Sequence, residues 1–299
     1  MRGKTTLEDP FIKFFEDTAF SPHSFKAYRY QKEDRKCWQA VVKGCLESWR
    51  IKAEAFYENV SETGFKKIGM DNILNLHGQK RLPFTPPEDS RVTKKSAITD
   101  MTEVLALQAL KWKEKDLIFP YPRVLHKEAY RLQHHGIDAI GYKKNADEYT
   151  LYVIEVMASV EDRHPPATVK DHLIQILPDT LDAAEPERLL MDLQTLHDES
   201  SDEHKDILNG FIIATYEGSF SSSDSVVAAP VLIRRFDEFH KNDWKPFIQK
   251  TRSFEMAKIP SNLLFIAVEC HESFSGLLDL IKGSTSGANN SEIENGEEY

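Results

Sequence analysis

Two acidic residues stand in neighbouring apolar segments, Asp138 near the start of residues 137–142 and Glu155 near the end of residues 151–156. Both segments are too short for a typical helix and are rich in β-branched residues, and the polar residues 145–148 between them are typical of a turn, so the pattern predicts a β-hairpin. If the turn is centred in the middle of 145–148, antiparallel pairing sets Asp138 opposite Glu155, with the side chains about 5 Å apart. Two carboxylates then share a small space.

Like charges this close disfavour double ionisation unless a cation neutralises them. A hard divalent ion, Mg²⁺ or Mn²⁺, suits the pair, because Mg²⁺ takes one or two protein carboxylates and leaves its other positions to water and a substrate phosphate. The backbone carbonyl of Val156 could supply a third protein oxygen. The alternative is an ordinary surface hairpin with two solvated acids. This alternative does not explain Glu155, because the glutamate interrupts a run where a buried strand prefers apolar residues.

The segment G-I-D at 136–138, the hairpin and the segment E-V-M at 155–157 resemble the core of restriction-endonuclease-like nucleases of the D…ExK type. The wider arrangement resembles the HamA family, the nuclease subunits of Hachiman anti-phage defence systems. The resemblance covers roughly residues 96–282 in the order of elements and is sharp over 133–159. It implies an α/β (α+β) fold around a mixed sheet, and a cytoplasmic Mg²⁺- or Mn²⁺-dependent DNase. The implied partners are DNA and an ATP-dependent, HamB-like helicase.

The same resemblance implies roles for individual residues. Asp138 and Glu155 would bind the metal, with Val156 contributing its carbonyl oxygen. A glutamate on the first helix of this fold often reaches the metal, and Glu103 matches that place. The alternative for Glu103 is a capping box with Asp100 as N-cap, because Glu103 follows three residues later and precedes apolar residues at helical spacing.

One position departs from the family pattern. The nucleases carry lysine two residues after the glutamate, where its charge stabilises the phosphate, and here that position is Met157, which has no charge and donates no hydrogen bond. Three explanations stay open: an inactivating substitution, a natural pseudo-nuclease, or a lysine from elsewhere. Lys170, on the predicted helix after the hairpin, is the best candidate for the last. Lys143 and Lys144 lie beside the turn, about 16 to 20 Å from Asp138.

Composition sets further bounds. The chain has 299 residues, 40% of them hydrophobic, enough for a large core. It contains no apolar stretch of about 20 residues that could span a bilayer and no phosphate-binding glycine loop, so we expect a cytoplasmic protein that does not hydrolyse ATP itself. Its three cysteines form no metal-ligand spacing. A second hypothesis, of a different class from the nuclease, is a non-catalytic subunit that binds DNA and the helicase and regulates them.

The net charge of −10 is unusual for a nucleic-acid enzyme, because phosphate binding relies on lysine and arginine. The acids are concentrated, however. Residues 283–299 carry four acids and no base, and residues 178–206 carry ten acids against two bases. The rest of the chain is slightly basic, with clusters that include Arg234 and Arg235. Such clusters are more often solvated surface than DNA contacts, and the acidic segment could shield the site or face a basic partner.

The organisation expected from the pattern has three parts. Residues 1–95 are predicted to be mainly helical and to end in a proline-rich connection, residues 96–282 to form the nuclease domain, and residues 283–299 to be a disordered acidic tail. Within the middle part the pattern predicts helices over 168–181, 187–197, 237–251 and 274–281, and strands over 122–126, 211–216, 226–233 and 263–268. Strands interspersed with helices favour one mixed sheet.

Overall fold

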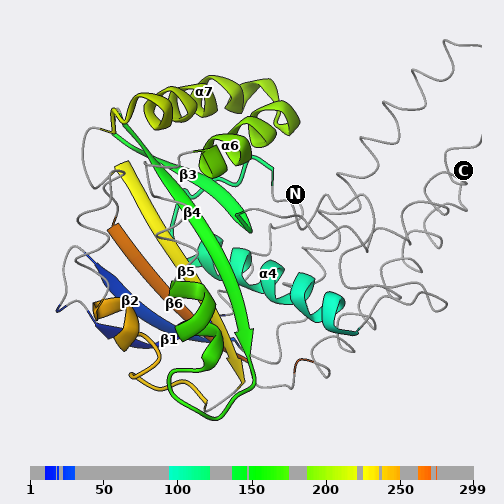
Figure 1. Ribbon diagram of the computed structural model, residues 1–299, viewed down its shortest axis with the longest axis vertical. Coiled ribbons are helices and arrows are strands. Elements are labelled where there is room, and N and C mark those ends of the chain that lie inside the picture. The colour runs from blue at the N-terminus through cyan, green and yellow to red at the C-terminus, as the bar shows by residue number, and fades with distance from the viewer. Residues whose placement is uncertain are drawn as a thin grey trace, which may run out of the picture.

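A computed structural model of the chain describes residues 11–17, 19, 23–30, 94–121, 137–146, 148–174, 187–220, 225–235, 238–249, 262–270 and 274. Six strands form one mixed sheet in the order β1-β2-β6-β5-β4-β3 (Figure 1). The strands are β1 Phe11–Asp17, β2 Ser24–Tyr30, β3 Ala139–Asn145, β4 Glu148–Ser159, β5 Val226–Arg235 and β6 Asn262–Cys270. The helices are α4 Lys94–Lys113, a short π-helix η3 Thr168–Leu173, α6 Glu187–Glu199 and α7 Asp202–Glu217. The expected mixed α/β class is confirmed.

The predicted hairpin is present with the predicted register. β3 pairs antiparallel with β4 from Ala139 opposite Ile154 to Asn145 opposite Glu148. The tight reversal at its tip has Ala146 in the left-handed region, at φ 53°. Continued by one residue, this register sets Asp138 opposite Glu155.

Strands β4, β5, β6 and β2 run parallel to one another, so their carboxyl ends lie at one edge of the sheet. The connection from β4 to β5 contains η3, α6 and α7. β5 carries Pro230 in its interior, opposite Glu155 of β4. Proline offers no N–H to a ladder, and the pairing of β5 with β6 is interrupted at Ala229 and Pro230, between the pairs Ala228–Leu263 and Val231–Ile266.

The two faces of the sheet carry separate cores. Tyr152, Ile154 and Val156 of β4 belong to the core that also contains the apolar residues of α4. Leu151 and Val153 belong to the other core, which contains apolar residues of α6 and α7. Because successive side chains of a strand alternate between faces, Glu155 points to the α6 and α7 face. Figure 1 shows these two helices beside β3 and β4.

The structure corrects three sequence predictions. Within the first 95 residues, which were predicted to be mainly helical, 11–17 and 24–30 are instead strands β1 and β2, and β2 pairs with β6; residues 31–93, with the predicted proline-rich connection, lie outside the described residues. Residues 211–216 are helical, within α7, although their β-branched and aromatic content favoured a strand; Leu208, Phe211 and Thr215 are buried at helical spacing. α4 begins at Lys94, six residues before Asp100, which is therefore inside the helix rather than its N-cap.

Other predictions hold within the described residues. α6, β5 and β6 cover the segments predicted at 187–197, 226–233 and 263–268. Helix 168–181 is confirmed over 168–174, and of 237–251 only 245–249 are helical among the residues described. The predicted strand at 122–126, nearly all of helix 274–281 and the tail 283–299 lie outside the described residues. None of the described helices is long and apolar enough to cross a membrane.

Candidate functional site

The side chains of Asp138 and Glu155 meet on the face of the hairpin that α6 covers. Their carboxyl groups are hydrogen-bonded to each other. Asp138 Oδ2 also accepts a hydrogen bond from the backbone N–H of Val156 at 2.7 Å, which holds the aspartate against β4. The pair therefore shares the small space that the hairpin register predicts.

Burial sets the chemistry of Glu155. The residue is 2% exposed, within a strand whose neighbours are apolar. Burial and the nearby charge of Asp138 raise the pKa of Glu155 from 4.5 to about 10, and the charge of Arg188 opposes this rise. Without a cation in the pair, Glu155 is thus protonated at neutral pH and the two carboxyl groups share one negative charge.

Helix α6 brings two further charged residues to the pair. Arg188 Nη2 lies 3.4 Å from Glu155 Oε1, and the arginine side chain is 39% exposed whereas the glutamate side chain is buried. Asp192, one turn later, is buried and its negative charge adds to the rise in the pKa of Glu155. Asp192 Oδ2 accepts the N–H of Ile137 at 2.9 Å and so fixes the chain beside Asp138.

Sequence reasoning missed Arg188 and Asp192 as site residues, counting both only in the charge of segment 178–206. A signal was present for Asp192. The buried leucines Leu189, Leu193 and Leu196 mark the core-facing stripe of α6, and position 192 falls on that stripe. An acid at a core position of an amphipathic helix indicates a specific partner, because a buried charge without one is costly.

Met157 lies on the same face of β4 as Glu155 and packs partly buried against the core beneath α6 and α7. It therefore stands two residues beyond Glu155 on the same face of the strand, the place where the resemblance leads us to expect a lysine. Lys143 and Lys144 pair with Thr150 and Tyr149 at the turn end of the hairpin, far from the carboxyl pair, as predicted. The side chain of Lys170, on η3, lies outside the described part of the structure.

The other predicted site residues are placed differently. Val156 meets Asp138 through its N–H, and the role of its carbonyl as a metal ligand stays a prediction. Glu103 is half-buried on α4, whose apolar residues pack on the opposite face of the sheet from Glu155. It is not among the groups that shift the pKa of Glu155. Its metal role stays a prediction, while the capping box is excluded because Asp100 lies inside the helix.

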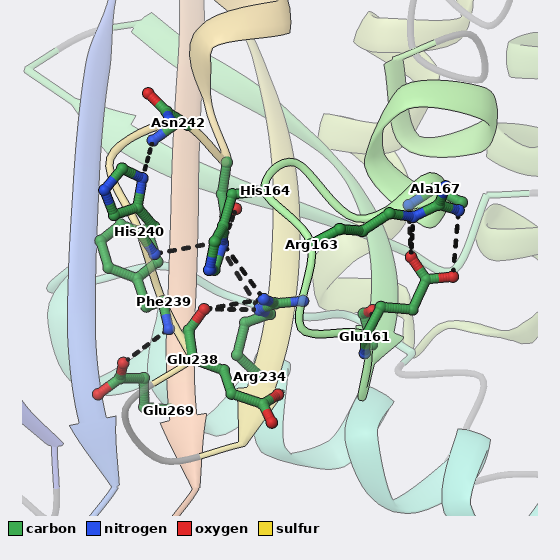
Figure 2. A network of polar contacts seen from close by, with 12 residues as sticks. Glu161, Arg163, His164, Ala167, Arg234, Glu238, Phe239, His240, Asn242 and Glu269 are labelled. Carbon is green, nitrogen blue, oxygen red and sulfur yellow. Dashed lines mark hydrogen bonds and ion pairs between the residues drawn. The ribbon is translucent and has the colours of Figure 1, made fainter.

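A second polar cluster lies at the carboxyl ends of β4 and β5. Arg234 is fully buried, with Nε 3.6 Å from Asp243 Oδ2, and Nη2 donates to the carbonyl oxygen of Glu238 at 2.8 Å. Figure 2 shows this network, in which Arg234 also approaches His164, and Glu161 binds Arg163. Arg234 is therefore neither solvated surface nor a DNA contact but an internal arginine that ties the loop 238–243 to the sheet.

The ligand atoms of the carboxyl pair suit a hard divalent cation, because all are oxygens and a double positive charge would offset the repulsion that keeps Glu155 protonated. Asp138 and Glu155 would hold such an ion. Within the described residues, no group of three or more histidine, cysteine, aspartate and glutamate side chains is gathered closely enough to form a metal site by itself. A cation held by these two carboxylates alone would take most of its ligands from water or substrate, as Mg²⁺ usually does.

Comparison with models of known protein families and with curated proteins finds no match for this chain.

Proposed function

We propose that this protein is a Mg²⁺- or Mn²⁺-dependent phosphodiesterase that acts on DNA, with Asp138 and Glu155 as its cation-binding residues. The observation that carries the proposal is the meeting of these two carboxyl groups on one face of a buried hairpin, where Glu155 has a pKa raised to about 10. Acids with strongly perturbed pKa values cluster at functional sites.

The order of elements supports the same reaction class. A helix (α4), an antiparallel hairpin with its acids at the open end, and a crossover to a parallel strand (β5) follow one another along the chain, as expected for a D…ExK nuclease. By the same resemblance, we propose a defence effector that works with a DNA-bound, HamB-like helicase. The helicase would supply ATP use, since the chain has no phosphate-binding glycine loop.

The roles of the residues follow from their positions. A bound Mg²⁺ supplies a Lewis acid that polarises the phosphate and lowers the pKa of a coordinated water. Asp138 and Glu155 would hold it, and the N–H of Val156 keeps Asp138 oriented. In the hydrolysis a water oxygen bonds to phosphorus, one P–O ester bond breaks, and the products are a phosphate monoester and a free hydroxyl.

Met157 favours a second candidate function, a subunit that binds DNA and the helicase without cleaving. The residue lies on the same face as Glu155 and offers neither charge nor a hydrogen-bond donor. If no other cation serves the site, hydrolysis would be slow or absent.

The experiment that tests the proposal is plasmid cleavage in Mg²⁺ or Mn²⁺, with and without a HamB-like helicase and ATP. Four proteins are compared: the natural chain, Glu155→Ala, Met157→Lys and the double variant of those two changes. Cleavage by the natural chain or by Met157→Lys that Glu155→Ala abolishes supports the nuclease. Glu148→Ala, an exposed glutamate of the same strand, is the matched control and should cleave like its parent.

Two results would reject the nuclease. One is the absence of cleavage by every form in all conditions, which favours the regulatory subunit. The other is cleavage that persists in Glu155→Ala, which would trace the activity to another site or to a contaminant.

A further inference from the structure

Arg188 is the charged group at the carboxyl pair that neither the hairpin pattern nor the family resemblance assigns. It stands second in α6, reaches across to β4, and brings Nη2 to 3.4 Å from Glu155 Oε1. Among the described residues it is the one cation that lowers the pKa of Glu155. The positive charge absent at position 157 is thus present nearby on another element.

The position of Arg188 is fixed by its helix rather than by the ion pair alone. Leu189, next to it, is fully buried in the core beneath α6. Asp192, four residues later and on the same side of the helix, accepts the N–H of Ile137 at 2.9 Å. The first turns of α6 are therefore tied to the start of the hairpin, and this tie fixes the position of Arg188 relative to Asp138. A cation held in this way meets the demand for preorganised charge at a reacting centre.

The exposure of Arg188 suits contact with a substrate. Glu155 is buried while the arginine side chain is 39% exposed, so Arg188 contacts both the buried carboxyl and the solvent. Guanidinium groups bind phosphate oxygens through two parallel hydrogen bonds and carry a permanent charge. A phosphodiester that approaches the pair can therefore contact this group.

We propose that Arg188 replaces the lysine of the D…ExK pattern, and that it binds and stabilises the phosphate whose ester bond is cut. This inference rests on the proposed nuclease function and deepens it. It also explains how Met157 is compatible with activity: the charge has moved from strand β4 to helix α6. With a cation at the pair, Glu155 would serve as its ligand and the guanidinium would be available to the phosphate.

If Arg188 binds the phosphate, its loss should change plasmid cleavage and cation affinity differently from the loss of a purely structural ion pair. Arg188 repels a divalent cation at the pair while it attracts the phosphate. Arg188→Ala should therefore slow plasmid cleavage by about 100-fold and leave Mn²⁺ affinity unchanged or several-fold tighter. If Arg188 only held α6 against the hairpin, its loss would loosen the pair, and both cleavage and Mn²⁺ affinity would fall.

The test uses the full chain and two measurements, single-turnover plasmid cleavage in Mn²⁺ and calorimetric titration with Mn²⁺ alone. The variants are Arg188→Ala, Arg188→Lys, Met157→Lys, and Arg188→Ala combined with Met157→Lys. We expect Arg188→Lys to retain part of the rate and the combined variant to regain most of it. Lys205→Ala is the control, because Lys205 is a cation of the neighbouring helix α7 in an exposed ion pair with Asp202. It should match the natural chain in both measurements.

The outcomes separate this inference from the function on which it rests. If Arg188→Ala cleaves as fast as the natural chain, or if only variants with Met157→Lys cleave whatever residue stands at 188, the inference is wrong and the nuclease stands. If the natural chain and Met157→Lys both fail to cleave, or if Mn²⁺ does not bind to the pair, the proposed function is wrong and this inference falls with it.

Discussion

The substitution Glu155→Gln probes the electrostatics of the carboxyl pair directly. Glutamine has the shape of protonated glutamic acid and can donate a hydrogen bond to Asp138 as that acid does. It cannot ionise and cannot serve as an anionic metal ligand. In the absence of divalent ions it should therefore reproduce the folded state of Glu155 without the cost of protonating it.

The magnitude follows from the pKa of Glu155, which folding raises from 4.5 to about 10. A raised pKa means that the folded protein binds more protons at Glu155 than the unfolded chain does at intermediate pH, so the contribution of Glu155 to stability is highest below pH 4.5 and is lost as the pH rises toward 10. The loss is about 1.4 kcal/mol per pH unit. At pH 7 it amounts to about 3 kcal/mol, which Glu155→Gln should recover.

The assay is urea denaturation in EDTA at pH 6, 7, 8 and 9, repeated with Mg²⁺. In EDTA the advantage of Glu155→Gln over the natural chain should grow with pH across this range. Saturating Mg²⁺ should stabilise the natural chain and have little effect on the variant, because ligand binding to the folded state alone shifts unfolding by mass action.

Glu148→Gln, an exposed position of the same strand, controls for the loss of one charge and should show no growing advantage. The reasoning would be refuted if Glu155→Gln were less stable than the natural chain at pH 8 in EDTA, or if the difference between them did not change with pH.

Two other predictions concern the fold around the site, both measured by urea denaturation. A Cβ at Gly141 would lie 2.9 Å from the backbone oxygen of Ile118, so Gly141→Ala should cost about 1 to 3 kcal/mol. Gly210→Ala, in α7 with nothing within 4 Å of the added carbon, should instead gain about 1 kcal/mol; equal effects would contradict the packing at β3. Asp243→Asn leaves the buried guanidinium of Arg234 without its carboxylate partner and should cost about 3 kcal/mol, whereas a cost under about 1 kcal/mol would show that the pair is unimportant.

Local patterns in the sequence were sufficient to predict the hairpin. Two apolar runs separated by a short polar turn fix the strand register, because the centre of the turn decides which residues lie opposite each other. The sequence alone therefore predicted that Asp138 lies opposite Glu155, and the register of β3 and β4 agrees. Strand β6 could also be predicted, because it is a short apolar run.

The predictions that were wrong or missed depend on contacts between distant parts of the chain rather than on local patterns. Residues 211–216 contain β-branched and aromatic residues, but their place in an amphipathic helix depends on packing against the sheet, and such packing overrides propensity. Strand β2 could not be paired with β6 from sequence, because the two strands lie near opposite ends of the chain and meet only in three dimensions. Arg188 and Asp192 reach the pair for the same reason: a crossover helix brings them, and no local pattern specifies which strand it covers.

The most direct test of the central claim, that Asp138 and Glu155 share one divalent cation, is the anomalous diffraction of a crystal soaked in Mn²⁺. We predict a single strong peak at the open end of the hairpin, within bonding distance of a carboxylate oxygen from each residue, and its disappearance in Glu155→Gln. A crystal with no peak there, or a Mn²⁺ ion bound by neither carboxylate, would contradict the claim.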